Sequence, residues 1–269
     1  MHSGWFYFNN GVKLFSLAFF SFIELSDPSK HRQYNQWHQL DHLPENLALE
    51  QVAWGQRWAR NGELRNIGIA LDPYTDIDYA AMYWFRGDPN TAVAQWEELG
   101  EETFQKGRGP LMPGVKRRLL AFFRPVEGQV ASRIGVGPEV LPYRPNQGVY
   151  ITLSQYQEPH GLATHERFRW ESQELLPALV SLGGVAGAWT MTFERFQADR
   201  SLPFDSTGGV PFGGMRMRLI YLDGDPEITA KTIEQKVTDL NDHCEEEVKN
   251  SEQVLISGPM SSITPWEDW

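Results

Sequence analysis

The sequence predicts an α+β fold built from two consecutive units, each with the element order strand, helix, strand, strand, helix, strand. The main observation is an internal repeat. Residues 37–53 align without a gap with residues 170–186, an offset of 133 (37 to 170), and Gly87-Asp88-Pro89 recurs as Gly224-Asp225-Pro226, an offset of 137 (87 to 224). The four-residue difference falls in a loop, where a true internal repeat tolerates an insertion.

In the first half, capping and turn signals separate the predicted elements. Asp27 before Pro28 is typical of a helix start, and Asp88 before Pro89 repeats the signal. Pro44 is expected to break the first helix because proline lacks an N–H donor and clashes with the preceding turn. The predicted strands are 15–25, 52–60, 78–86 and 116–124, with helices at 28–42 and 90–105, a short helical piece to about residue 49, a short strand within 67–71 and an extra edge strand at 5–8.

The second half repeats this order. The predicted strands are 149–157, 185–196, 215–222 and 253–263, and the predicted helices are 159–182 and 226–248. Each half is therefore a ferredoxin-like unit whose helices cover one face of its sheet, and two such sheets can bury their other faces against each other. We expect a single-chain pseudo-dimeric α+β barrel, with a first unit at 1–125, a linker at 126–147 and a second unit at 148–269.

Composition narrows the class of partner. The chain has 269 residues, 41% of them hydrophobic, and ten tryptophans, which indicates a packed globular protein. The net charge of −11 argues against nucleic acids and anionic membranes as partners. Cys244 is the single cysteine, which fits a reducing compartment, and the apolar run 14–23 is too short to span a bilayer. We expect a cytoplasmic protein with a small-molecule partner, and the sequence leaves open whether two such chains form a homodimer.

The first copy of the repeat resembles a known family. Its pattern is Tyr34-x-x-Trp37, then Asp41-His42-Leu43-Pro44-Glu45, Leu47-Ala48-Leu49 and Gly55-x-Arg57-Trp58. This pattern is similar to the EthD-like branch of the dimeric α+β barrel superfamily. The resemblance implies a dimeric α+β barrel fold. It does not imply a particular reaction, because relatives include muconolactone isomerases, polyketide cyclases, cofactor-free monooxygenases and haem-handling enzymes. The second copy departs from the pattern, with Leu175 at the position of His42 and Thr190 at that of Arg57.

His42 is the first candidate catalytic residue. A helix break before Pro44 would direct the imidazole into the cleft between helix and sheet, where it can take or give a proton near neutral pH. Asp41 is a further candidate, although neighbouring helical residues do not share a face. The alternative is that His42 caps a helix end or is bonded to a backbone carbonyl.

Arg57 is the third candidate catalytic residue. It is predicted to share a strand face with Ala53, Gly55 and Ala59, whose small side chains leave room for a ligand or a helix. Its guanidinium could stabilise a carboxylate, phenolate or enolate oxygen, or pair with a helix carboxylate such as Glu45. The candidate substrate-binding residues, for which core packing is the alternative role, are Tyr34, Trp37, His38, Trp54 and Tyr83.

The histidines are the candidate ligands for a metal or a haem. His38 and His42 are four residues apart, a spacing that can hold a metal, but the glutamate of an HExxH motif is missing. We therefore expect no metal. A haem would take its axial ligand from His31, His38, His42 or His165.

The resulting main hypothesis is a cofactor-independent enzyme, an isomerase, cyclase or lyase, that acts by general acid/base chemistry on a small apolar, aromatic or polyketide-like molecule. Three alternatives remain open at this point: a cofactor-free monooxygenase, a haem-binding or haem-degrading protein, and a non-catalytic small-molecule binder.

Overall fold

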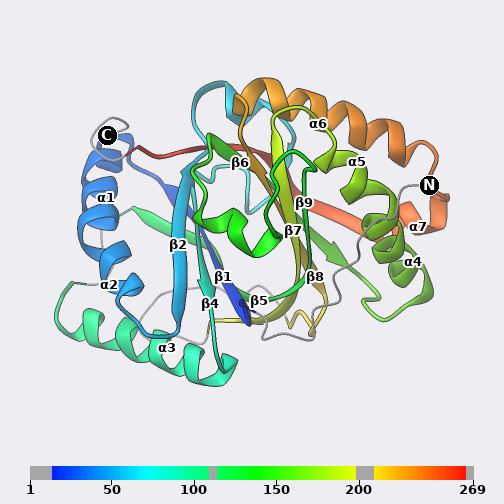
Figure 1. Ribbon diagram of the computed structural model, residues 1–269. Helices are drawn as coiled ribbons and strands as arrows, with labels where there is room; N and C mark the ends of the chain where they lie inside the picture. Colours follow the sequence, from blue (N-terminus) through cyan, green and yellow to red (C-terminus); the bar gives the residue numbers. More distant parts are fainter. Residues whose placement is uncertain (1–13, 109–113, 198–208, 265–269) are drawn as a thin grey trace.

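The chain forms one closed antiparallel barrel with helices packed on its outside (Figure 1). The computed structural model describes residues 14–108, 114–197 and 209–264, so the predicted strand at 5–8 lies outside the described residues. The strand order is β2-β4-β1-β5-β7-β8-β6-β9-β3, and a pairing between β2 and β9 closes the ring. The strands are β1 Leu17–Leu25, β2 Val52–Ala59, β3 Ile69–Ala70, β4 Tyr79–Phe85, β5 Val115–Val130, β6 Gly148–Tyr156, β7 Val185–Phe196, β8 Met215–Leu222 and β9 Glu252–Ser262.

The two halves have the same topology. The first contributes β2-β4-β1-β5 and the second β7-β8-β6-β9, which is the same order of equivalent strands. The predicted fold class, a pseudo-dimeric α+β barrel within one chain, is confirmed. The helices are α1 His31–Trp37, α2 Leu43–Leu47, α3 Pro89–Gln105, α4 Leu162–Trp170, α5 Leu176–Val180, α6 Pro226–Asn241 and α7 Glu246–Asn250. No helix in the described ranges is long and apolar enough to cross a membrane.

The two seams that join the halves are unequal. Strands β5 and β7 pair over nine residues, from Ala121 opposite Phe196 to Val130 opposite Gly187. Strands β2 and β9, as far as the structure describes them, pair only at Trp58 with Ser262 and at Ala59 with Ser261. The barrel is therefore held firmly along one side and loosely along the other.

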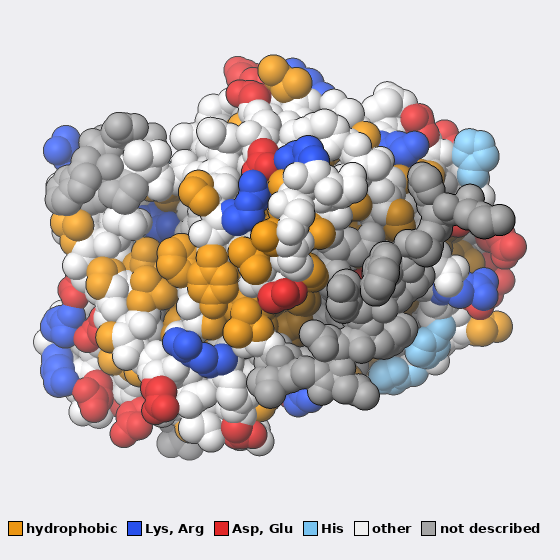
Figure 2. All heavy atoms as spheres, viewed as in Figure 1, with side chains coloured by type: hydrophobic (Ala, Val, Ile, Leu, Met, Phe, Trp, Pro, Cys, Tyr) orange, Lys and Arg blue, Asp and Glu red, His pale blue; other side chains and the backbone are white. Residues whose placement is uncertain are grey.

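The barrel interior is filled with side chains. Its core holds Trp58, Trp84, Phe20 and Tyr221, each 2% exposed or less, so the barrel is not an open channel. Three further hydrophobic clusters lie outside this core, one under α2 and α3, one under α5 and α6, and one beside α1 that includes Tyr34 and Tyr79. Figure 2 shows hydrophobic side chains gathered near the middle of one face, where Figure 1 places β2 and the segment 131–147.

Pro44 does not break the first helix, so that prediction is wrong. A π turn, His38–His42 (η2), precedes α2, and the Leu43 N–H bonds to the His38 carbonyl five residues back. The ring of a proline clashes with a carbonyl of the preceding α-helical turn. The wider π turn removes this clash, so the helix continues. The second half uses the same device, with a π turn at Glu171–Leu175 (η5) before Pro177.

Two predicted boundaries differ from the observed elements by six residues or more (124 against 130, and 248 against 241). Strand β5 runs on to Val130, through residues expected to lie in the linker, and a register shift between Pro125 and Glu127 accommodates the proline, which cannot donate to the ladder. The long helix predicted at 226–248 ends at Asn241 and is followed by the separate helix α7.

Candidate functional site

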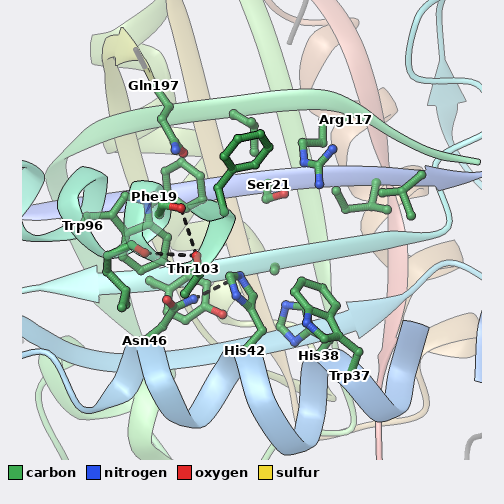
Figure 3. A pocket seen from close by; sticks show the side chains of 18 of the residues that line it. Phe19, Ser21, Trp37, His38, His42, Asn46, Trp96, Thr103, Arg117 and Gln197 are labelled. Carbon is green, nitrogen blue, oxygen red and sulfur yellow. Dashed lines mark hydrogen bonds between the residues drawn. The ribbon is translucent and has the colours of Figure 1, made fainter. Parts of the chain in front are cut away.

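A cavity lies between the outer face of β1, β4 and β5 and the helices α1, η2, α2 and α3 (Figure 3). Its walls are mainly apolar, with Phe19, Trp37, Trp96 and Leu99 among them. The empty space is about 730 Å³ with its mouth included, and the enclosed part open to the centres of water molecules is about 70 Å³. At roughly 10–15 Å³ for each water, this is room for about five to seven waters, the bulk of a single-ring molecule.

His42 projects from η2 into this cavity (Figure 3). Its ring stacks on Trp37, with the centroids 4.6 Å apart and the planes at 22°. The Asn46 amide nitrogen lies 3.1 Å from Nε2 and donates to it, which leaves the proton of the neutral ring on Nδ1. Burial lowers the pKa of His42 to about 4, and the charge of Arg117 acts in the same direction. His42 is therefore neutral at pH 7.

His38 lies one turn earlier and also lines the cavity. Its ring meets that of His42 edge to face, at a centroid distance of 5.1 Å. Only 3% of the residue is exposed, and its Nδ1 has no hydrogen-bond partner among the described residues. Burial lowers the pKa of His38 well below its usual range, with smaller contributions from Arg57 and His42. The cavity thus contains two neutral imidazoles in contact.

Arg57 is buried next to the cavity without being part of its wall. Its guanidinium lies over the Tyr34 ring at 5.2 Å and the Tyr79 ring at 4.7 Å, and donates to the Asn35 side-chain oxygen. The alternative pairing with Glu45 does not occur, because Glu45 bonds to Arg108 on the surface. Arg57 therefore acts on the cavity through its charge and through Tyr34.

The other predicted site residues divide into two groups. Tyr34 and Tyr83 line the cavity, together with Trp37 and His38. Asp41 lies on the surface and pairs with Arg108, as expected for a residue on a different helix face from His42. Trp54 packs against the interior core and against Tyr143, on the opposite face of β2. Neither Asp41 nor Trp54 is brought to the cavity.

The space expected beside Gly55 is taken by the protein itself. A Cβ atom at Gly55 would lie 2.6 Å from Cδ1 of Tyr83 and 3.1 Å from Leu43. The register shift between Val52 and Trp54 also leaves Ala53 against the interior core, so Ala53 does not share the face of Arg57. The glycine is needed for the close approach of the Tyr83 ring rather than for a ligand.

The sequence analysis missed five polar residues of the wall, namely Ser21, Asn46, Thr103, Arg117 and Gln197. Ser21 offered a signal, since it is a lone small polar residue in the otherwise apolar strand LAFFSFIEL. Arg117 stands within a run of three basic residues and Gln197 directly follows β7, so neither could be distinguished from a surface residue. No described residue of the wall is an aspartate or glutamate.

The corresponding place in the second half is filled by a buried ion cluster of Arg167, Glu171, Arg216, Arg218 and Glu252. By the two repeat offsets these residues correspond to Tyr34, His38, Tyr79, Ala81 and Val115. Glu171 accepts from Arg216 and Arg218, each at 2.6 Å, and Glu252 accepts from Arg167 at 2.6 Å. All five side chains are at most 8% exposed. The first half therefore keeps an apolar cavity where the second half has packed charges.

The carboxylates of this ion cluster are ionised. Burial alone would raise the pKa of Glu252, but the charges of Arg167 and Arg218 outweigh burial and lower it to about 2. The same balance, with Arg216 and Arg218, lowers the pKa of Glu171. Across the described ranges, no group of three or more His, Cys, Asp and Glu side chains is arranged to hold a metal ion.

Comparisons with known proteins agree with the fold. No protein-family model and no curated protein sequence matches the chain. Similar solved structures include the encapsulated DyP-type peroxidase from Mycobacterium smegmatis, with TM-score 0.52, 8% identity and 94% of each chain covered. A DypB variant in complex with manganese has TM-score 0.52 and 9% identity over 92% of this chain and 93% of that one. An anthrone oxidase-like protein has TM-score 0.43 and 10% identity over 94% and 95%. The two likenesses with TM-score 0.52 show the fold alone, an α+β barrel contained in one chain.

Proposed function

We propose that the chain is an enzyme that acts by general acid/base chemistry on a small, mostly apolar, single-ring molecule bound in the first-half cavity. The observation that carries this proposal is the neutral His42, which projects into an apolar cavity with a bonding partner on Nε2. The proposed reactions are isomerisation, cyclisation or elimination, each of which requires a proton to leave one atom and reach another.

His42 would receive the proton on Nε2, whose single lone pair becomes free when the Asn46 side chain turns its amide nitrogen away. A neutral imidazole can accept a proton. An enolate that forms beside His42 raises the pKa of the imidazole, because the negative charge stabilises the protonated ring. Asn46 suits both states, since its amide nitrogen donates to the neutral ring and its amide oxygen, after rotation, accepts from the protonated one. Arg117 in the cavity wall supplies positive charge for the enolate oxygen. The proton then returns from Nε2 to a different substrate atom.

The size and charge of the cavity define the substrate class. Space for about five to seven waters suits one ring with short substituents. The substrates expected from the sequence are thereby narrowed, and extended polyketides are disfavoured. A wall without described carboxylates and with an arginine suits a substrate bearing a carbonyl or hydroxyl oxygen.

Proton exchange tests the role of His42 without knowledge of the natural substrate. The protein is incubated in D2O with cyclohexanone, 2-cyclohexenone and acetophenone, and loss of the α-proton signals is followed by NMR. We expect His42→Gln to slow the protein-dependent exchange by about 10²–10⁴-fold, the usual contribution of a positioned acid/base group. His243→Gln, at an exposed histidine on the other half, is the matched control. Equal exchange rates in His42→Gln and the unmodified protein would contradict the proposal, as would the lack of protein-dependent exchange with all three ketones.

Cofactor-free oxygenation is the second candidate. Arg117 and the absence of described wall carboxylates favour a substrate anion, and an electron-rich anion is the species such chemistry requires. Oxygen uptake with single-ring hydroquinones, measured against the rate without protein, distinguishes it from proton transfer alone. A non-catalytic binder would bind these compounds with neither exchange nor oxygen uptake.

A haem is larger than the enclosed part of the cavity. The space within its walls is that of a single ring, and the corresponding place in the second half is filled by the ion cluster. Of the four histidines proposed as axial ligands, His38 and His42 line the cavity, whereas His165 is exposed and His31 is bonded to the Tyr79 hydroxyl at 2.7 Å outside it. We therefore derive no step through haem.

A further inference from the structure

A second cavity, called the seam cavity here, lies where the short β2–β9 seam ends. It is formed by His31 and Asn35 of α1, by residues 59–62 at the end of β2 and just beyond it, and by Arg65. Asp78 and Tyr79 at the start of β4 and residues 261–263 at the end of β9 complete it. Its empty volume is about 870 Å³ with the mouth included. Because β2 and β9 pair at only two described positions, the space that further pairing would fill stays open and is lined by polar groups.

Arg60 is the buried charge of this wall. The residue is 3% exposed, and its two terminal nitrogens donate to the carbonyls of Thr75 at 3.1 Å and Arg65 at 3.2 Å. Its Nε has no hydrogen-bond partner among the described residues, and no carboxylate of the described ranges forms an ion pair with it. Burial and the charge of Arg65 lower the pKa of Arg60, and the charge of Asp76 offsets this only in part. A buried guanidinium held mainly by carbonyl dipoles is costly, since a buried charge normally requires a paired counter-charge.

Arg57 adds a second uncompensated charge directly behind the wall. It too is 3% exposed, and its Nε and one terminal nitrogen have no hydrogen-bond partner in the part of the chain that the structure describes. Its other terminal nitrogen donates to Asn35, which in turn donates to the Tyr79 hydroxyl at 3.2 Å. Asn35 and Tyr79 both line the seam cavity, so they connect Arg57 to it.

The balance of charge around the seam cavity is positive. Three arginines, Arg57, Arg60 and Arg65, face one buried carboxylate, Asp78, which already pairs with Arg65 and accepts from the Leu25 N–H. His31 lies 3.9 Å from that same carboxylate. The ion cluster of the second half is different, because there two buried glutamates bond to the three arginines. In a chain of net charge −11, two buried arginines without a bonded carboxylate in the described ranges are exceptional.

We infer that the seam cavity is a binding site for a small molecule with an oxyanion group, a phosphate or a carboxylate, which supplies the counter-charge that Arg60 lacks. Guanidinium groups form paired hydrogen bonds with both kinds of oxyanion. Arg65 at the rim would contact the same group, and Asn35 and His31 offer further polar contacts. This site is separate from the cavity of His42, so the inference does not depend on the proposed reaction.

The test uses the full chain and three sodium salts, phosphate, benzoate and chloride, at pH 7.5 and matched ionic strength. A ligand that binds only the folded state raises the melting temperature in a saturable way. We expect saturable stabilisation by phosphate or by benzoate but not by chloride, and calorimetric titration should give a matching dissociation constant. Saturation by phosphate alone or benzoate alone identifies which oxyanion is bound.

Two variants locate the binding site. Arg60→Gln keeps hydrogen-bond donors but removes the charge, so it should weaken binding of the anion at least tenfold. Arg65→Gln, at the half-buried rim, should weaken anion binding less. This second variant still tests the site if Arg60→Gln does not fold. Arg124→Gln, in an ion pair with Glu194 across the other seam, between β5 and β7, is the matched control and should bind as the unmodified protein does. Equal effects of all three salts, or undiminished binding by both Arg60→Gln and Arg65→Gln, would overturn the inference.

Discussion

Replacement of Glu171 by Gln is expected to lower the free energy of unfolding at pH 7 by about 3–5 kcal/mol, the usual cost of removing one partner from a buried ion pair. Glu171 is 1% exposed and its two oxygens accept from Arg216 and Arg218. Glutamine keeps the size of the side chain but removes the charge. Three buried arginines would then share the single carboxylate of Glu252. Urea or guanidinium unfolding curves measure the change.

A matched control distinguishes the effect of removing a buried charge from that of removing an exposed one. Glu227 forms an exposed pair with Lys231 one turn along α6, with side-chain exposures of 42% and 63%. Glu227→Gln should cost about 0.5 kcal/mol or less, because water already screens that pair. If Glu171→Gln proved as mild as this control, the ion cluster could not be the compensated network that the geometry indicates.

Acidification is expected to destabilise the fold before the carboxylates titrate. The pKa of His42 is about 4 in the folded chain and about 6.5 when unfolded, so the unfolded chain binds the proton more readily. The stability contributed by the neutral ring is therefore complete above pH 6.5 and is lost as the pH falls towards 4. Between pH 7 and 5 this amounts to about 2 kcal/mol for His42. The lowered pKa of His38 acts in the same direction.

Unfolding curves recorded at pH 7 and pH 5 for three proteins test this expectation. Between the two pH values, the free energy of unfolding of His42→Gln should fall by about 2 kcal/mol less than that of the unmodified chain, because the variant has no ring to protonate at this position. His243→Gln, at an exposed position, should retain the full dependence. A His42→Gln variant with an unchanged pH dependence would show that His42 is not held neutral by burial.

Much of the fold was predictable because it depends on local patterns. The strands at 185–196 and 215–222 agree with the predicted bounds, since apolar runs bounded by glycine and loop residues determine them. The capping aspartates were also predictable, and Asp88 and Asp225 accept from backbone N–H groups as expected. Whether the two halves arose by tandem duplication stays a prediction, although their strand orders agree.

The site was only partly predictable because it depends on which strands become neighbours. His42, His38, Trp37 and Tyr34 come from one continuous segment and meet as expected. Arg117 and Ser21 reach the cavity only because β5 pairs with β1, which no local pattern reveals. The rule that proline ends a helix also failed, because it assumes α-helical spacing and Pro44 follows a π turn.

The unequal seams have a consequence for motion. Detaching β9 from β2 breaks main-chain pairing at two described residues, whereas detaching β7 from β5 breaks it at nine. Partial unfolding tends to begin where the fewest contacts must be lost. The barrel should therefore open first between β2 and β9, while the remaining strands stay paired.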